Sequence, residues 1–259
     1  MTAPTLPTLA LQLDLAWEDR DRNLDQIETA LDHARPGPKT LVVLPEMTAS
    51  GFSMNTQSVC ESLSGPSITR LSELAAQRRL RILTGLAIRG DEGIAKNLAI
   101  LLDEQGTISG AYQKNQPFSF GGEHEHYQAG EDIAIFEIDG AKVAPFICYD
   151  LRFPELFRRA VQKGAEVFAV IANWPEKRAR HWSTLLRARA IENQAAVIGV
   201  NRCGEDPSHQ YSGDSAILDA MGDSLAEAEN EPVALHATID LEALRTWRQR
   251  FPALKDMKS

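Results

Sequence analysis

The sequence predicts an α/β protein, in which a mixed β-sheet carries helices packed on its outer faces. Segments with strand periodicity and segments with helix periodicity alternate along the chain. Short hairpin signals lie among them, which adds antiparallel pairs to the strand–helix units. No linker, low-complexity tract or internal repeat divides the 259 residues. We therefore expect one domain that covers residues 1–259.

The first part of the chain carries two strand–helix units. The strands are indicated by period-two alternation and by a brief buried apolar run, and the helices by apolar side chains three and four residues apart. Proline and glycine mark the ends of these segments. The expected order is strand, helix, strand, helix, over residues 9–15, residues 23–34, residues 40–44 and the residues that follow Ser64-Gly65-Pro66.

Three strands are expected next, before a long polar segment. Residues 81–88 and 97–102 are predicted to pair around Gly90–Gly93, and a further strand runs from Gly106 to about Gln113. Residues 114–131 are polar, rich in glycine and histidine, and have no period. A loop of that length inside a compact domain is usually functional.

The last part of the chain begins with a hairpin. Residues 133–138 and 142–147 flank Asp139-Gly140, which is a strong signal for a short hairpin turn. The remaining expected elements are a helix at 154–163, a strand at 166–172, a helix near 178–194, a strand at 196–201, hairpin-like strands at 210–220 and 233–239, and a last helical turn at 241–248.

Composition limits the class of partner and the compartment. A net charge of −9 argues against a nucleic-acid surface and against an anionic membrane as partner. No apolar run approaches the roughly 20 residues that a membrane helix needs, and no signal peptide is evident at the N-terminus. Three cysteines without a CxxC pair indicate a reducing compartment. These features predict a soluble, cytoplasmic protein.

Cys148 is the strongest candidate for a reactive group. It ends the apolar run 143–147 and precedes Pro154, which fits the first turn of a helix. Unpaired N–H groups and the helix dipole at such a place favour an anion, so we expect a lowered thiol pKa and an available thiolate. A buried cysteine is also often an inert hydrophobe, and Cys148 alone leaves both interpretations open.

Two further side chains stand immediately beyond predicted strands. Glu46 follows the buried run 41–44, and Lys114 follows the strand that ends near Gln113. Each alone would be interpreted as a solvated surface charge. Because sites in α/β sheets collect at the carboxyl ends of strands, the shared placement with Cys148 indicates one site. An acid, an amine and a thiol suffice for acyl transfer through a thioester.

Longer motifs carry a family resemblance. They occur in family order and span most of the chain: Leu44-Pro45-Glu46-Met47, Tyr112-Gln113-Lys114, residues 148–156 (CYDLRFPEL) and residues 188–194 (ARAIENQ). The sequence resembles the nitrilase (carbon–nitrogen hydrolase) superfamily. The resemblance implies a four-layer αββα sandwich, a catalytic triad of Glu46, Lys114 and Cys148, and a second active-site glutamate at Glu123. We expect no metal and no cofactor.

The closest resemblance is to the ω-amidase branch, on residues 45–54, Ala172-Asn173-Trp174-Pro175 and His181-Trp182. Enzymes of that branch hydrolyse the terminal amide of small α-keto acid amides such as 2-oxoglutaramate and release ammonia. One segment departs from the family pattern, which usually reads Lys-x-His-Leu-Phe. Here Gln116-Pro117 stands between Lys114-Asn115 and Phe118. We expect this departure to change the shape of the pocket or the reaction rate, and not the class of reaction.

The resemblance also suggests supporting and substrate-binding roles. The backbone N–H of Tyr149 is expected to stabilise the oxyanion together with Lys114. Glu123 either positions Lys114 or the substrate amide, or forms a structural ion pair with Lys114. Candidates for the substrate pocket are Phe118, Tyr149, Asn173 and Trp174, with core packing as the alternative for the aromatic residues. Arg152 or Arg178 is expected to bind the remote carboxylate of the substrate, although Arg152 could instead bind Glu155.

Other functions remain open on the sequence alone. Glu123, His124, Glu125 and His126 could suggest a metal site, but no third ligand cluster with zinc spacing accompanies them. The same triad serves superfamily members that hydrolyse nitriles, N-carbamoyl amino acids or deaminated-peptide amides. A non-catalytic binding protein on this scaffold is a third alternative. The resemblance further implies a homodimer, in which the helices at 154–163 and 178–194 contribute to the contact.

Overall fold

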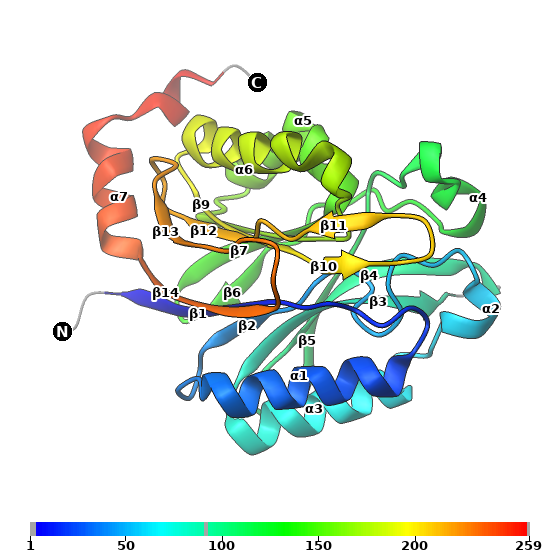
Figure 1. The fold of residues 1–259 in the computed structure, drawn as a ribbon. Coiled ribbons are helices and arrows are strands. Elements are labelled where there is room, and N and C mark those ends of the chain that lie inside the picture. Colours follow the sequence, from blue (N-terminus) through cyan, green and yellow to red (C-terminus); the bar gives the residue numbers. More distant parts are fainter. Residues whose placement is uncertain (1–3, 91–92, 258–259) are drawn as a thin grey trace.

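Two six-stranded β-sheets face each other, and helices cover the outer face of each sheet, so the fold has four layers (Figure 1). The structure is a computed structural model that describes residues 4–90 and 93–257. This arrangement confirms the predicted α/β class with mixed sheets, and it confirms the αββα order that the resemblance implied. The division into two sheets was not evident from the strand pattern itself.

The first sheet has the order β14-β1-β2-β3-β4-β5. Strands β1, β2 and β3 are parallel, and the other pairs are antiparallel. The antiparallel pairing of β3 with β4 agrees with the predicted strand pair, while residues 91–92 of the predicted turn lie outside the described residues. The strands of this sheet are β1 (Thr5–Gln12), β2 (Leu41–Val43), β3 (Arg81–Arg89), β4 (Ala95–Leu102), β5 (Ile108–Gln113) and β14 (Val233–Asp240).

The second sheet has the order β13-β12-β9-β8-β7-β6. Strands β7, β8 and β9 are parallel at its centre, and the β6–β7 hairpin turns at Asp139-Gly140 as predicted. A separate two-stranded hairpin, β10–β11, lies beside the sandwich. These strands are β6 (Phe136–Ile138), β7 (Ala141–Ile147), β8 (Val167–Ala172), β9 (Ala196–Asn201), β10 (Cys203–Glu205), β11 (Gln210–Ser212), β12 (Ala216–Leu218) and β13 (Ser224–Glu227).

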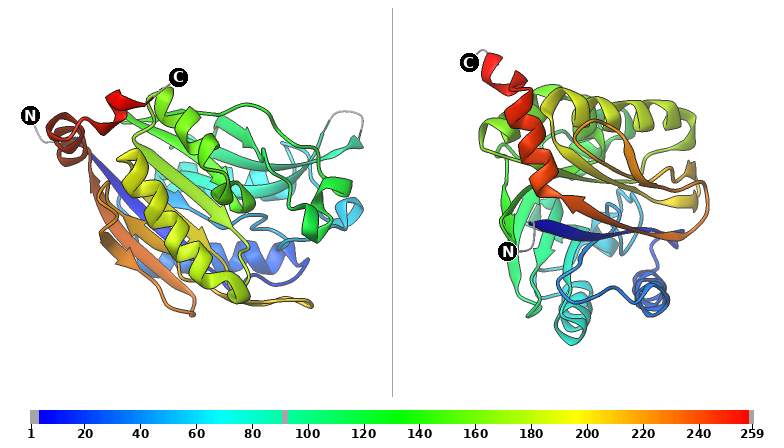
Figure 2. Two further views of the ribbon diagram at one scale, coloured as in Figure 1. Left: turned by 90° about the horizontal axis from the view of Figure 1, so that it is seen from above. Right: turned by 90° about the vertical axis from the view of Figure 1, so that its left-hand side faces the viewer.

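Helices α1 (Arg20–Ala34) and α3 (Pro66–Arg78) cover the first sheet, while α5 (Pro154–Gln162) and α6 (Ala179–Asn193) cover the second (Figure 1). Helix α7 (Leu241–Arg250) follows β14 at one edge of the sandwich, near the start of β1 (Figure 2). Two one-turn helices, α2 (Thr56–Val59) and α4 (Glu123–His126), lie in the connections. Within the described ranges, no helix is both long and apolar enough to span a bilayer.

The alternation of side chains along β1 explains how the layers form. Leu6 and Ala10 pack into the core between the two sheets, whereas Leu9 and Leu11 pack under α1 and α3. Both faces of β1 are therefore buried over most of its length, whereas the period-two alternation over residues 9–15 predicted a strand with one buried face. Burial of each such leucine contributes roughly 1.5–3 kcal/mol.

The predicted strand at residues 210–220 is divided in the structure. Its first part, β11, pairs with β10, whereas its second part, β12, pairs with β9 and β13 in the second sheet. The break falls at Gly213, whose positive φ of 69° ends the extended chain. Residues 233–240 then pair with β1 in the other sheet, so the two predicted segments form no hairpin with each other.

The parallel strands at the centre of each sheet direct their carboxyl ends to the same edge of the sandwich. Glu46 follows β2 and Cys148 follows β7 at that edge. Lys114 comes directly after β5, and Asn173 directly after β8. The fold therefore brings four chain segments together at one place.

Candidate active site

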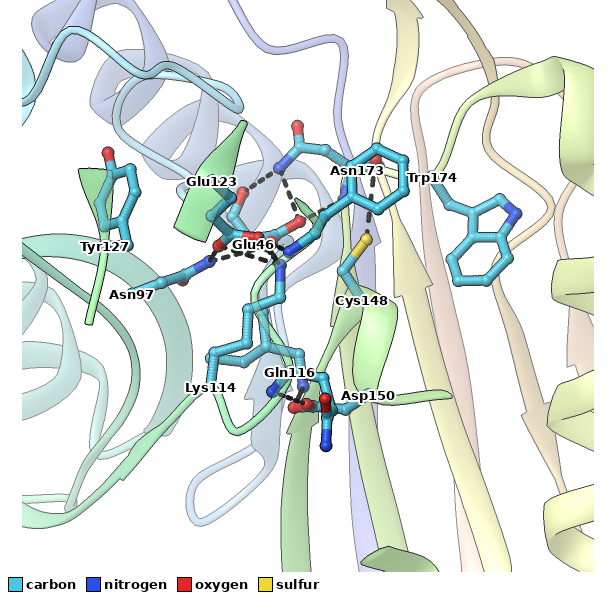
Figure 3. Close-up of polar contacts among 12 residues, drawn as sticks. Glu46, Asn97, Lys114, Gln116, Glu123, Tyr127, Cys148, Asp150, Asn173 and Trp174 are labelled. Carbon is cyan, nitrogen blue, oxygen red and sulfur yellow. Dashed lines mark hydrogen bonds and ion pairs between the residues drawn. The ribbon is translucent and has the colours of Figure 1, made fainter. Parts of the chain in front are cut away.

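Glu46, Lys114 and Cys148 converge at the carboxyl ends of their strands (Figure 3). Lys114 Nζ lies 2.8 Å from Glu46 Oε1, and both side chains are closed off from solvent. The Cys148 thiol donates toward the carbonyl oxygen of Asn173, with Sγ and O 3.8 Å apart. The structure thus places an acid, an amine and a thiol from three separate strands in one cluster.

Glu123 is the fourth charged member of this cluster. Its Oε2 and Oε1 atoms lie 2.8 and 3.1 Å from Lys114 Nζ, and its side chain is fully buried. The backbone N–H of Phe118 donates to Glu123 Oε2 at 2.6 Å. Lys114 therefore lies between two carboxylates, and the ion pair with Glu123 that the sequence left open is present.

The residues beside Glu123 point away from the cluster. His124 and Glu125 are exposed, with 3.9 Å between Nε2 and Oε1. Among residues 4–90 and 93–257, no group of three or more His, Cys, Asp or Glu side chains is placed to hold a metal ion. Glu123, which the metal hypothesis needs, is bound to Lys114.

Asn97 of β4 is a member of the cluster that the sequence analysis missed. Its Nδ2 atom lies 2.8 Å from Glu46 Oε1 and 2.9 Å from Glu123 Oε1, so one amide group bridges both carboxylates (Figure 3). The sequence showed only a polar residue at the start of the predicted apolar strand 97–102, and the structure shows that its side chain is buried within β4. A buried polar side chain needs hydrogen-bond partners, and here both partners are carboxylates.

Asn173 supports Glu46 from the second sheet. Its backbone N–H donates to Glu46 Oε2 at 2.9 Å, and its Nδ2 donates to the Glu46 carbonyl oxygen at 2.7 Å. Together with Lys114 and Asn97, these donors fix both carboxylate oxygens of Glu46. The Glu46 side chain thus has a defined orientation before any substrate arrives.

The charges of the cluster decide the protonation of Lys114. Burial alone would lower the pKa of Lys114, but the charges of Glu123 and Glu46 outweigh burial and raise that pKa above its ordinary value. Lys114 therefore keeps its proton throughout the neutral range. A permanent cation at this place can stabilise an oxyanion.

The expectation of a lowered thiol pKa is wrong for the free protein. Burial, followed by the negative charge of Glu46, raises the pKa of Cys148 well above its ordinary value, although Lys114 opposes the shift. Cys148 begins the 3₁₀ turn Cys148–Arg152, and α5 begins only at Pro154, so the thiol is not at the end of a long helix dipole. The resting group is a neutral thiol beside a carboxylate.

The backbone of Cys148 has a left-handed conformation, with a φ of 46°. Few residues other than glycine adopt this conformation, and it persists only where the surroundings hold it. The turn places the thiol at the wall of a pocket of about 390 Å³. The side chain is 9 % exposed, whereas Glu46 and Lys114 lie behind it, away from solvent.

The pocket contains every substrate-binding residue that the sequence analysis named. Phe118, Tyr149, Arg152, Asn173, Trp174 and Arg178 all line it. No substrate-binding role was predicted for the rest of the wall, which comes from other connections and from the β10–β11 hairpin. These further residues include Trp17, Phe52, Met54, Phe120, Asp206, Ser208, His209 and Tyr211.

Two arginines of this pocket lie on aromatic rings. Arg152 Cζ is 4.7 Å from the centroid of the Trp174 ring, and Arg178 Cζ is 5.5 Å from that of Phe118. Arg152 Nη2 lies 3.2 Å from His181 Nδ1. In the described part of the chain, neither arginine forms an ion pair with a carboxylate, so the alternative partner of Arg152, Glu155, is not engaged.

Comparisons with known proteins agree with this geometry. Residues 9–249 match the family model described as carbon-nitrogen hydrolase. The omega-amidase YafV of Yersinia enterocolitica is 39% identical over 255 residues, which are 97% of this chain and 96% of that protein. A 2-oxoglutaramate amidase of Bacillus subtilis is 33% identical over 250 residues, with 96% of each chain covered.

A solved structure shows the same fold. The chain superimposes on a CN-hydrolase superfamily protein of Xanthomonas campestris with a TM-score of 0.91 and 34% identity, over 98% of both chains. That protein carries an arsenic adduct in its active site. The mixed two-sheet architecture is therefore shared over the full length of the chain.

Proposed function

The chain belongs to the carbon–nitrogen hydrolase family and is a hydrolase that acts on amides, and we propose that its substrate is the terminal amide of a small α-keto acid such as 2-oxoglutaramate. The observation that carries the proposal is the pocket itself. A thiol backed by Glu46 and Lys114 lies on one part of its wall, and two arginines without an acidic partner lie on another.

The two arginines supply the binding site for the substrate carboxylate. Both arginines line the same pocket, and burial, followed by the charge of Arg178, lowers the pKa of Arg152. An anionic ligand between them removes that repulsion and forms charge-assisted hydrogen bonds. Each guanidinium group also contacts an aromatic ring of the pocket, Arg152 that of Trp174 and Arg178 that of Phe118.

Acylation of the thiol is the first step of the proposed mechanism. Glu46 accepts the proton of Cys148 as the sulfur attacks the amide carbon, and the electron pair of the carbonyl moves to its oxygen. Lys114 Nζ and the backbone N–H of Tyr149 stabilise this oxyanion. The carbonyl re-forms while Glu46 transfers the proton to the nitrogen, so ammonia leaves and a thioester remains on Cys148.

Hydrolysis of the thioester completes the cycle. Glu46 takes a proton from water, the hydroxide adds to the thioester carbon, and the same two donors stabilise the second oxyanion. The carbonyl then re-forms, the sulfur leaves with the proton that Glu46 returns, and the free carboxylic acid departs. Asn97 and Asn173 keep Glu46 aimed at the reacting atoms in both halves.

A comparison of substrates tests this function. Hydrolysis is measured by the release of ammonia from 2-oxoglutaramate, a simple nitrile and an N-carbamoyl amino acid, and by the release of the free peptide amine from a deaminated-peptide amide. We expect the highest kcat/KM for the keto-acid amide. A higher kcat/KM for one of the other three classes would overturn the substrate assignment, and no product from any of the four would favour the binding-protein alternative.

The proposal also covers the oligomeric state and the cellular location of the protein. We propose a homodimer in which α5 and α6 contribute to the contact, supported by the exposed apolar side chain of Ile191 on α6. Sedimentation velocity tests this, and a monomer at micromolar concentration would contradict it. We also propose a cytoplasmic location, supported by three free cysteines, all buried.

A further inference from the structure

We propose that Asp150 is a positioning residue, whose carboxylate holds the segment after Lys114 and the turn that carries Cys148 in fixed relation to each other. The inference rests on the proposed function for the reaction that it supports. Asp150 touches no reacting atom and acts through the backbone of its neighbours.

Three donors from three parts of the fold meet at this carboxylate. Asp150 Oδ2 accepts hydrogen bonds from the backbone N–H of Ile147 at 2.9 Å and from the Tyr112 hydroxyl at 2.8 Å. Oδ1 accepts from the backbone N–H of Gln116 at 2.9 Å (Figure 3). The side chain is fully buried, so no water competes for these contacts.

The position of these donors in the chain gives them their importance. Ile147 immediately precedes Cys148, Gln116 lies two residues after Lys114, and Tyr112 lies two residues before it. A displacement of the carboxylate would therefore move the thiol and the ammonium group relative to each other. A misplacement of about 1 Å in such a site can cost on the order of 10² in rate.

The strained conformation of Cys148 adds a second reason. Its φ of 46° needs support from the surrounding structure. Asp150 belongs to the same 3₁₀ turn and reaches back to the N–H of Ile147, just before the strained residue. The carboxylate thus closes the turn that presents the thiol.

This role also explains how the departure at Gln116-Pro117 fits the fold. Asp150 binds the backbone N–H at position 116, which every residue except proline supplies. Glu123 accepts from the backbone N–H of Phe118. Pro117 lies between these two anchored positions and has no N–H to satisfy, so the segment can bear a proline there without an unpaired donor.

The ionised form of Asp150 is the form that accepts all three bonds. Burial raises the pKa of Asp150 to about 7, although the hydrogen bonds and the charge of Lys114 oppose the shift. The other titratable groups here are the Tyr112 hydroxyl, whose pKa is raised well above its ordinary value first by burial, and Arg159, which acts on that hydroxyl. Below about pH 7 a protonated oxygen faces donors, and one contact is lost.

The experiment compares Asp150→Asn with wild type in two assays. In the first, kcat should fall about 10²-fold while KM changes less than about 3-fold, since the pocket is untouched. In the second, iodoacetamide labels Cys148, and peptide mass spectrometry separates this cysteine from Cys60 and Cys203. Labelling should slow in the variant. Because the thiolate fraction of Cys148 rises with pH in both proteins, the ratio of the wild-type rate to the variant rate is compared, and this ratio should rise with pH through about 7.

Asp223→Asn is the matched control, because it makes the same change at an exposed position between β12 and β13. It should keep both rates. The proposal is overturned if folded Asp150→Asn labels and turns over as fast as wild type, or if its losses only match the fraction of unfolded protein. If that variant does not fold, the pH profile of wild type decides: a labelling rate that rises about tenfold per pH unit, as thiolate formation alone requires, with no steeper region near pH 7, overturns it.

The labelling assay needs no substrate, so the two proposals can fail separately. Wild type that does not hydrolyse keto-acid amides, while its Cys148 labelling still depends on Asp150, would contradict only the proposed substrate. Hydrolysis of these amides with labelling independent of Asp150 would contradict only the positioning role.

Discussion

Lys114 and Glu46 form an ion pair inside the protein, with Nζ 2.8 Å from Oε1 and both side chains almost inaccessible to solvent. The pair joins the end of β5 to the loop after β2, and Glu123 completes it from α4. Removal of one member of such a cluster leaves an uncompensated buried charge, which costs more free energy than the pair itself provides.

Lys114→Met should therefore impair both stability and catalysis. We expect the free energy of unfolding to fall by about 3–5 kcal/mol, because two carboxylates lose their shared cation. Turnover should fall at least about 10²-fold, because the oxyanion loses a donor. Urea denaturation and ammonia release measure the two effects. If the variant unfolds with its transition midpoint at the same urea concentration as wild type, the ion pair has no structural importance.

Asn97 offers a test of how Glu46 is held. Asn97→Ala removes the donor to both carboxylates, and Asn97→Asp puts a third carboxylate among them. We expect kcat to fall about 10-fold in the first variant and further in the second, because like charges at this distance repel. The assay is kcat at saturating substrate. Equal rates in the two variants would exclude the electrostatic explanation.

Arg178 tests the carboxylate site. Arg178→Ala should raise KM for a keto-acid amide about 10-fold or more, since a hydrogen bond to a charged group contributes about 1.5–3 kcal/mol. A neutral amide such as butyramide lacks the carboxylate and serves as the internal control. Its kcat/KM should change little. A similar loss for both substrates would indicate that Arg178 supports the fold of the pocket and does not bind the anion.

Asp150 also makes stability depend on pH. Its pKa in the folded protein is about 7, above the ordinary value of 3.8, so the folded state binds the proton more tightly. This contribution is present in full below about pH 4 and is lost as the pH rises toward 7, by up to about 1.4 kcal/mol per unit. Urea denaturation of wild type and Asp150→Asn should show this slope only in wild type. If the free energy of unfolding depends on pH in the same way in both proteins, the raised pKa of Asp150 is contradicted.

The strand ends were predictable because the apolar runs were short and each stopped at a chemically distinct residue. Glu46, Lys114 and Cys148 all followed such runs, and the fold places them together. The sign of the Cys148 pKa shift was not predictable. It depends on the depth of burial and on the distance to Glu46, and neither is visible in a local segment.

Other parts of the site depended on contacts between distant segments. Asn97 lies in a strand that was correctly predicted, but its bridging role exists only because α4 and the loop after β2 meet over it. The part of the pocket wall that the β10–β11 hairpin supplies was not predicted, because β10 is only three residues long and Asp206, Ser208 and His209 lie in the turn between the two strands. The division of residues 210–220 at Gly213 was not predicted either, because strands as short as β11 and β12 show no clear periodicity.

The covalent intermediate is the most direct test of the mechanism. Wild-type protein is mixed with 2-oxoglutaramate, quenched in acid within milliseconds, and analysed by intact mass and peptide mapping. We predict an acyl group on the peptide that contains Cys148, formed with a burst of ammonia, and neither signal in Cys148→Ala. Wild-type turnover by Cys148→Ala would contradict the account.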